Sequence, residues 1–175
     1  MIKIIFASVL LAFPALAQTE PSDFVRIGQM DVVIDGKPAV FQIGTIREGR
    51  ESFADVSDEE GQAVVGIMGS TLDAERRYDH PSLSFRLPLV GGLPGPFSLI
   101  SYTEVEHGAP GPILAGAPAG ELHLLNFSLS QEGAVEFDFS AKLLRMDNAW
   151  EPLSGLPPVE ISGRVYVTIP DAFRE

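Results

Sequence analysis

The sequence predicts an all-β fold, a single-domain antiparallel β-sandwich or partly open barrel of about eight or nine strands. Short segments in which apolar and polar residues alternate recur along the chain, with glycine, proline or aspartate between them. This period of two is typical of a sheet with one solvated face. The sequence contains no long segment with the period of an amphipathic helix. Both observations favour packed layers of strands.

Residues 1–17 have the pattern of a secretory signal peptide. Lys3 gives a charged start, residues 4–13 form an apolar run, and Ala15 and Ala17 are the small residues that a signal peptidase reads. The run is shorter than the roughly 20 residues that a membrane-spanning helix needs. We therefore expect cleavage after Ala17, one all-β domain over residues 18–175, and a periplasmic or secreted location in a bacterium.

Composition narrows the choice of partners. The chain of 175 residues carries a net charge of −12, and loss of Lys3 with the signal makes it more negative. Such a charge repels phosphate backbones and anionic lipid headgroups, which disfavours binding to nucleic acid or to membranes. The chain has no cysteine. Because a lipid-anchored precursor needs a cysteine at its cleavage point, we expect no stable membrane anchor after signal cleavage.

A hairpin opens the predicted domain. Asp35-Gly36 is a strong signal for a two-residue turn, and it separates the apolar runs 31–34 and 39–43. Further strands are expected at 63–68 and 82–87, where apolar residues again alternate or cluster between turn signals.

One short helix is expected near residues 70–78. Ser70 and Asp73 form an N-terminal capping pattern ahead of a helix-forming stretch. Pro81 prevents the helix from continuing, so it would be a short connection between two strands.

The clearest alternation lies in the C-terminal half, where strands are expected at 97–105, 121–129, 134–144 and 161–169. The third of these has one apolar face, comprising Val135, Phe137, Phe139, Ala141 and Leu143. In the fourth, Ile161, Gly163, Val165, Val167 and Ile169 alternate with Ser162, Arg164, Tyr166 and Thr168. The apolar faces should form the core, and their large side chains favour a filled interior.

Metal-binding patterns are weak. The best calcium candidate is the acidic run 55–60, with Asp55, Asp58 and Glu59 as oxygen ligands. It lacks the spacing of an EF-hand, so we expect a solvated hairpin loop without bound metal. The histidines His80, His107 and His123 lack the paired spacing of a zinc site. The sequence predicts no cofactor.

The sequence also lacks familiar catalytic signatures. It contains no G-x-S-x-G nucleophile elbow, no H-E-x-x-H and no phosphate-binding glycine loop. A carboxylate-dependent hydrolase needs two acids about 5–10 Å apart. Glu104 with Glu121, or Glu106 with Asp138, are such pairs without specific support. We expect no catalytic residues and favour a protein that is not an enzyme.

Two apolar segments rich in glycine and proline, 88–96 and 108–120, flank the strand expected at 97–105. We expect both to be loops. Their candidate residues for contact with a partner or ligand are Leu89, Leu93, Ile113 and Leu114. The alternative is that these residues fold back as lids over the ends of the core.

These observations predict an exported, non-catalytic binding or accessory protein of the bacterial periplasm or exterior, whose partner is an unknown protein or a small apolar ligand. The first alternative is a lipocalin-like carrier of small apolar ligands, because a closed barrel can enclose a cavity. The second alternative is a carboxylate-dependent hydrolase. The inward-facing phenylalanines argue against an open cavity and favour the binding protein.

Overall fold

The computed structural model describes residues 23–46, 49–72, 78–106, 109–115, 121–147 and 151–174, and at 78–79, 105–106 and 109–115 it describes the backbone alone. The expected signal peptide, residues 1–17, lies outside these ranges. No helix in the described ranges is long and apolar enough to cross a membrane.

The all-β class is confirmed, and every pairing between the described strands is antiparallel. The elements are β1 (Val25–Ile34), β2 (Lys37–Ile46), β3 (Glu51–Ser52), β4 (Ala54–Glu59), β5 (Gln62–Leu72), β6 (Tyr78–Val90), β7 (Leu93–Pro94), β8 (Leu99–Glu106), β9 (Ala109–Ala115), β10 (Glu121–Leu129), β11 (Ala134–Arg145), β12 (Val159–Thr168) and a short 3-10 helix, η1 (Asp171–Phe173).

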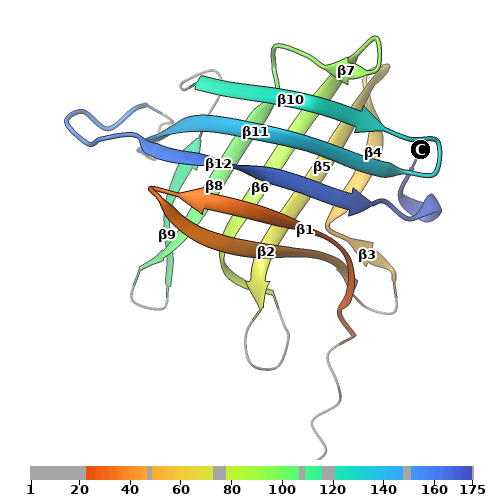
Figure 1. Ribbon diagram of the computed structural model, residues 1–175, viewed down its shortest axis with the longest axis horizontal. Helices are drawn as coiled ribbons and strands as arrows, with labels where there is room; N and C mark the ends of the chain where they lie inside the picture. Colours follow the sequence, from red (N-terminus) through yellow and green to blue (C-terminus); the bar gives the residue numbers. More distant parts are fainter. Residues whose placement is uncertain are drawn as a thin grey trace, which may run out of the picture.

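The strands form two layers that cross each other (Figure 1). The front layer contains β10, β11, β12, β1 and β2, and the back layer contains β9, β8, β6, β5 and β4. The layers join at two corners. There β11 pairs with β9 through Leu144 and Arg145, and β2 pairs with β5 through Gln42 and Ser70. Eight strands thus make a nearly closed ring, to which β4 and β10 are attached at the side.

Tight turns set the register of the hairpins. The predicted turn at Asp35-Gly36 joins β1 to β2, with φ angles of 45° and 78°. Glu60-Gly61 joins β4 to β5 in the same way, with φ angles of 55° and 84°, and Gly91-Gly92 joins β6 to β7 at 61° and 82°. Two successive positive φ angles define the turn whose twist matches that of the flanking strands, and glycine adopts them without strain.

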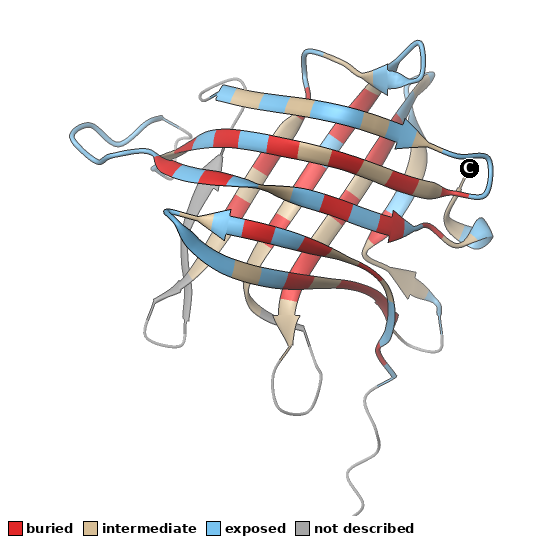
Figure 2. Cartoon of the chain, in the orientation of Figure 1, coloured by how far each residue is buried: buried red, intermediate tan, exposed pale blue. Residues whose placement is uncertain are grey.

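Side chains fill the space between the two layers. Figure 2 shows buried and exposed residues alternating along the front strands, and the inward faces predicted for β11 and β12 are confirmed. Phe85 of the back layer packs edge-on against Phe137 and Phe139 of the front layer, with ring centroids 5.1 and 4.9 Å apart. Edge-to-face pairs of this kind are favourable beyond their buried area. Around them lie fully buried side chains from both layers: Met30, Phe41, Ile43, Leu83, Leu87, Ile100 and Leu143.

The prediction of a helix near 70–78 is wrong at both ends of that segment, which are strands. Ser70 belongs to β5, which continues to Leu72, and β6 already begins at Tyr78. Residues 73–77, between them, lie outside the described ranges. Thr71 pairs with Asp79 across the two strands. Cross-strand pairing of a long hairpin has therefore overridden the local capping pattern, as tertiary contacts often do.

Three segments expected to be loops contain strands. The acidic run 55–60 lies largely in β4, the segment 88–96 contains the end of β6 and all of β7, and the segment 108–120 contains β9. The strand expected from Phe97 begins instead at Leu99, and Phe97 lies in a turn. Glycine, proline and acidic residues are depleted in strands, so strands that contain them are hard to detect from pattern alone.

Candidate functional site

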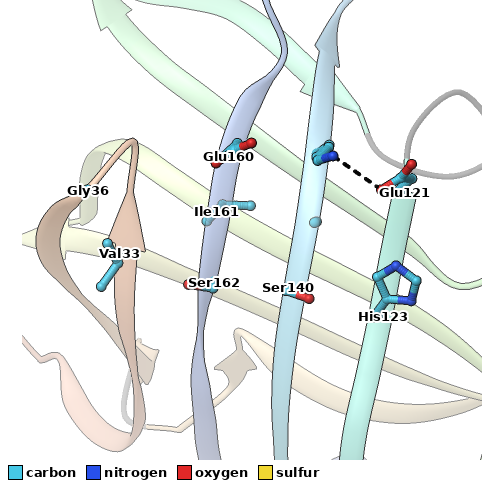
Figure 3. A pocket seen from close by; sticks show the side chains of 10 residues that line it. Val33, Gly36, Glu121, His123, Ser140, Glu160, Ile161 and Ser162 are labelled. Atoms are coloured by element: carbon cyan, nitrogen blue, oxygen red, sulfur yellow. Dashed lines mark ion pairs between the residues drawn. The ribbon is translucent and has the colours of Figure 1, made fainter.

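The outer face of the front layer carries a row of side chains from four neighbouring strands. Val33 of β1 lies opposite Ser162 of β12, which lies opposite Ser140 of β11, which in turn lies opposite His123 of β10. All four are exposed. Figure 3 shows them side by side across the sheet. Antiparallel register therefore brings together residues that are far apart in the sequence.

A charged row runs beside this one, toward the ends of the same strands. Glu160 lies opposite Lys142, and Lys142 lies opposite Glu121, with 3.6 Å between Lys142 Nζ and Glu121 Oε2 (Figure 3). The Glu160 backbone N–H donates a hydrogen bond of 2.9 Å to Asp35 Oδ1, which fixes the β1–β2 turn against β12. Exposed ion pairs add only about 0–1 kcal/mol to stability. The charged row therefore adds little to stability, and its Glu121 and Lys142 side chains stay accessible to solvent.

Together the two rows surround a hollow of about 320 Å³, which we call the serine hollow. Gly36 completes its rim, and the backbone of Ala141 and Ile161 contributes to its lining. The side chains of Ala141 and Ile161 are buried in the core. The serine hollow is therefore a depression on a solid wall, and a ligand would enter it from solvent.

The described contacts of the serine hollow include no paired nucleophile and base. A serine nucleophile needs a base within hydrogen-bonding distance, about 2.6–3.2 Å. Although Ser140 and His123 are cross-strand neighbours, the described contacts include no hydrogen bond between their side chains. The described residues also contain no group of three histidine or carboxylate side chains that would hold a metal ion. What the hollow offers is a set of hydroxyl, carboxylate, imidazole and ammonium groups.

A second polar feature lies on the inner side of the wall, at the β9–β11 corner. Arg145 donates two hydrogen bonds to Glu104, of 2.7 and 3.1 Å, in the forked geometry that strengthens such pairs. Burial raises the pKa of the neighbouring Tyr102, with Glu104 adding to the rise, Arg145 opposing it and Asp35 adding to it. Glu104 and Arg145 are the last described residues of the inward-facing series on β8 and β11, whose preceding members are Tyr102 and Leu143.

Of the two carboxylate pairs considered for hydrolysis, Glu104 with Glu121 is not assembled. Glu104 bonds to Arg145, and it continues the inward series of Ile100 and Tyr102 on β8. Glu121 lies on the outer face beside Lys142. The two carboxylates therefore belong to different sides of the sheet. The side chain of Glu106, the other candidate, lies outside the described ones.

The structure describes the side chains of two of the four apolar residues proposed for partner binding, Leu89 and Leu93. Leu89 is half-buried against the core, whereas Leu93 is 60% exposed at the β6–β7 hairpin. Ile113 and Leu114 lie in β9, and their side chains are outside the described ones. The β6–β7 hairpin precedes the start of β8 at Leu99, whereas Ile113 and Leu114 lie opposite Thr103 and Tyr102, in the middle of β8. A shared apolar rim stays a prediction for Ile113 and Leu114.

The weak calcium candidate has a plain structural explanation. Asp55 and Glu59 point to one side of β4 and Asp58 to the other, because side chains alternate along a strand. Asp58 Oδ1 accepts a hydrogen bond of 2.7 Å from the Gly61 backbone N–H, and Glu59 pairs with Arg86. Asp58 therefore serves the β4–β5 turn and Glu59 a cross-strand ion pair, and Asp58 lies on the opposite side of β4 from the other two carboxylates.

Sequence reasoning missed the serine hollow. His123 had been set aside because no second histidine stands at a metal-binding spacing, and Ser140 and Ser162 are ordinary outward positions of alternating strands. The sequence shows that these residues face outward, but it does not show that they are neighbours. That they lie side by side follows only from the strand order β1, β12, β11, β10.

Comparisons with known proteins do not assign a family to this chain. No protein-family model matches it, and neither does any curated protein or solved structure.

Proposed function

We propose that this chain is an exported, non-catalytic binding or accessory protein of a bacterial envelope, periplasmic or secreted, and that it holds its partner on the outer face of the front layer. The observation that carries the proposal is the contrast between the two sides of this layer. Phe41, Phe137 and their neighbours fill the inner side, while the outer side is hollowed and polar. Ligand pockets are concave surfaces with a few placed polar groups, which describes the serine hollow.

Two other functions fit less well. A carrier of small apolar ligands needs inward residues too small to fill the barrel. Here the described inward positions of β6 and β11 hold Leu83, Phe85, Phe137 and Phe139, all at most 3% exposed. A hydrolase needs converging titratable groups in a site that excludes water. The acids and histidine of the serine hollow are exposed.

Export is supported by the N-terminal pattern in residues 1–17. We expect the protein recovered from the periplasm or the medium to begin at Gln18, which N-terminal sequencing would establish. A protein that retains Met1 and fractionates with membranes would contradict both the cleavage point and the location.

Binding is tested by nuclear magnetic resonance on the ¹⁵N-labelled mature protein, titrated with a concentrated envelope extract. We expect amide shifts concentrated on the outer positions of β10, β11 and β12. A double variant, Ser140→Tyr with Ser162→Tyr, should abolish these shifts because the two rings fill the serine hollow. The matched control is Ser57→Tyr on β4, in the other layer, which should leave the shifts unchanged. Shifts that are absent, or that survive the double variant, would contradict the proposed surface.

A further inference from the structure

The outward residues of β12 connect the serine hollow to a second hollow on the same face. The outward side chains Glu160, Ser162, Arg164 and Tyr166 are all exposed, whereas Ile161 and Val165 between them are buried and Gly163 is half-buried. From Glu160 to Tyr166 a strand extends about 20 Å, at roughly 3.3 Å per residue. Because β12 lies between β1 and β11, side chains flank this line on both sides. The face is therefore suited to an extended ligand that follows β12.

The second hollow, of about 290 Å³, lies beside Tyr166 and is lined by residues of β1 and β12, including Arg26, Gln29, Asp31 and Arg164. We call it the tyrosine hollow. Tyr166 is 51% exposed, although it stands in the middle of a sheet. In the cross-strand row, Gln29 lies on one side of it and Glu136 on the other. An exposed aromatic ring is thus flanked by an amide and a carboxylate.

Several charged side chains on this face have partners within the protein. Arg164 donates a hydrogen bond to Glu136, and its Nε lies 3.8 Å from Asp138 Oδ1. Gln29 Nε2 donates to both carboxylate oxygens of Asp31 at 3.1 Å. Lys142 has Glu121 beside it in the same manner. Two cations of this face, Arg164 and Lys142, are thus paired with carboxylates, and a third, Arg26, donates a hydrogen bond of 3.4 Å to Gln42 Oε1. The face presents many donors and acceptors in fixed positions.

This pairing selects the kind of ligand. An anionic polymer would have to approach a chain of net charge −12 and displace the carboxylates from Arg164. A cationic peptide would have to displace Arg164 and Lys142 from their carboxylates. A hydroxyl group both donates and accepts hydrogen bonds, so a neutral polyhydroxylated ligand can bond to paired groups without separating them. The apolar face of a sugar ring can also stack on an aromatic side chain, as other apolar groups do.

We propose that the outer face of β12 binds a neutral glycan chain, with Tyr166 as the stacking platform and the serine hollow as a second subsite. The inference rests on the proposed function and adds the chemical class of the partner. Apart from Gly36 in the β1–β2 turn, its residues stand on paired strands, and ligand contacts on a rigid sheet need little ordering when the ligand binds. The site is therefore already formed in the free protein.

The test is calorimetric titration of the mature protein with neutral tetrasaccharides of glucose, galactose, mannose and N-acetylglucosamine. We expect at least one of them to bind with a Kd between about micromolar and millimolar. Tyr166→Ala should weaken that binding by about tenfold or more, because the stacking surface is removed, whereas Tyr166→Trp should retain it. The matched control is Phe97→Ala. Phe97 is 79% exposed but lies in the turn before β8, so its loss should change nothing.

A second measurement does not depend on any variant. In the ¹⁵N-labelled wild-type protein, the tetrasaccharide that binds should shift the amides of residues 160–166 and their cross-strand partners. No heat and no shifts with any of the four sugars would overturn the glycan assignment. Binding that is unchanged in Tyr166→Ala, with shifts elsewhere, would overturn the assigned site.

Titration with the envelope extract distinguishes a wrong glycan assignment from a wrong binding function. If the sugars do not bind but the extract still shifts the outer face, and protease treatment of the extract removes the effect, the partner is a protein. The binding function would then stand and the glycan inference would fall. If neither sugars nor extract perturb the outer face, both fail.

Discussion

The two faces of β11 and β12 belong to different physical environments, although their residues alternate along the same backbone. On the inner face, Phe137, Phe139, Val165 and Val167 are at most 3% exposed. On the outer face the same strands present Ser140, Arg164, Tyr166 and Thr168 to solvent. Because side chains alternate with a period of two, adjacent residues face the core and the solvent in turn. Substitutions on the inner face should therefore change the stability of the protein far more than substitutions on the outer face.

The largest expected effect is the loss of a ring on the inner face. Phe137→Ala should lower the free energy of unfolding by about 3–5 kcal/mol, because it removes a buried ring and leaves a cavity. Phe137 is 1% exposed and packs edge-on against Phe85, with centroids 5.1 Å apart. Chemical denaturation measures the change. A loss below about 1 kcal/mol would mean that the interior repacks and that the inner face is not a close-packed core.

The next effect concerns a residue of the inner series that has no side chain. A Cβ atom added at Gly163 would lie 2.3 Å from the Asp31 carbonyl oxygen and 2.9 Å from Val32 Cα, both on β1. Gly163→Ala must push β1 away from β12 and should cost about 1–3 kcal/mol, as overpacking does. The neighbouring Ser162→Ala, on the outer face, is the control and should cost under about 0.5 kcal/mol. Equal costs for the two variants would show that the strands separate freely.

A smaller effect is expected on the outer face. Asp138→Ala should cost under about 1 kcal/mol, as substitutions at solvated positions usually do. Asp138 accepts a hydrogen bond of 2.7 Å from Asn126 Nδ2 and lies near Arg164, but both contacts are exposed. Denaturation of Asp138→Ala beside Phe137→Ala compares adjacent residues of one strand. If the acid were the costlier of the two, the faces would be exchanged and the register shifted by one residue.

Alternation explains how much of the fold the sequence predicted. It placed Leu83, Phe85 and Leu87 of β6 in the core, and the inward series of β11 and β12 likewise, because each residue's face depends only on its own strand. The Asp35-Gly36 hairpin was predicted because its turn chemistry is local. The strands β4 and β9 were not predicted, because β4 is acidic and β9 contains two prolines, and such residues are depleted in strands.

The serine hollow could not be predicted from the pattern of any single strand. Val33, Ser162, Ser140 and His123 come from four strands whose order in the sheet is β1, β12, β11, β10. The pairing of β1 with β12 joins nearly the two ends of the domain. Period-two analysis identifies an outward residue but not its neighbour on the next strand. Candidate sites on sheet faces therefore require strand order as well as alternation.

The smallest expected effect is a pH dependence at the edge of the back layer. Partial burial raises the pKa of Asp55 above its ordinary value of 3.8; a hydrogen bond from the Gly66 backbone opposes the rise, and Glu59 adds to it. Because the folded state binds this proton more tightly than the unfolded chain does, Asp55 adds stability below pH 3.8, and that contribution is lost as the pH rises through the raised pKa. Asp55→Asn removes the titration. Relative to the wild type, the variant should gain stability as the pH rises from about 3 to 7, by no more than about 0.5 kcal/mol, as at other surface positions. Denaturation midpoints across this range measure it, with Asp58→Asn on the opposite side of β4 as the comparison. A relative loss in Asp55→Asn would mean that the Gly66 hydrogen bond outweighs desolvation, and that Asp55 stabilises the edge in its charged form.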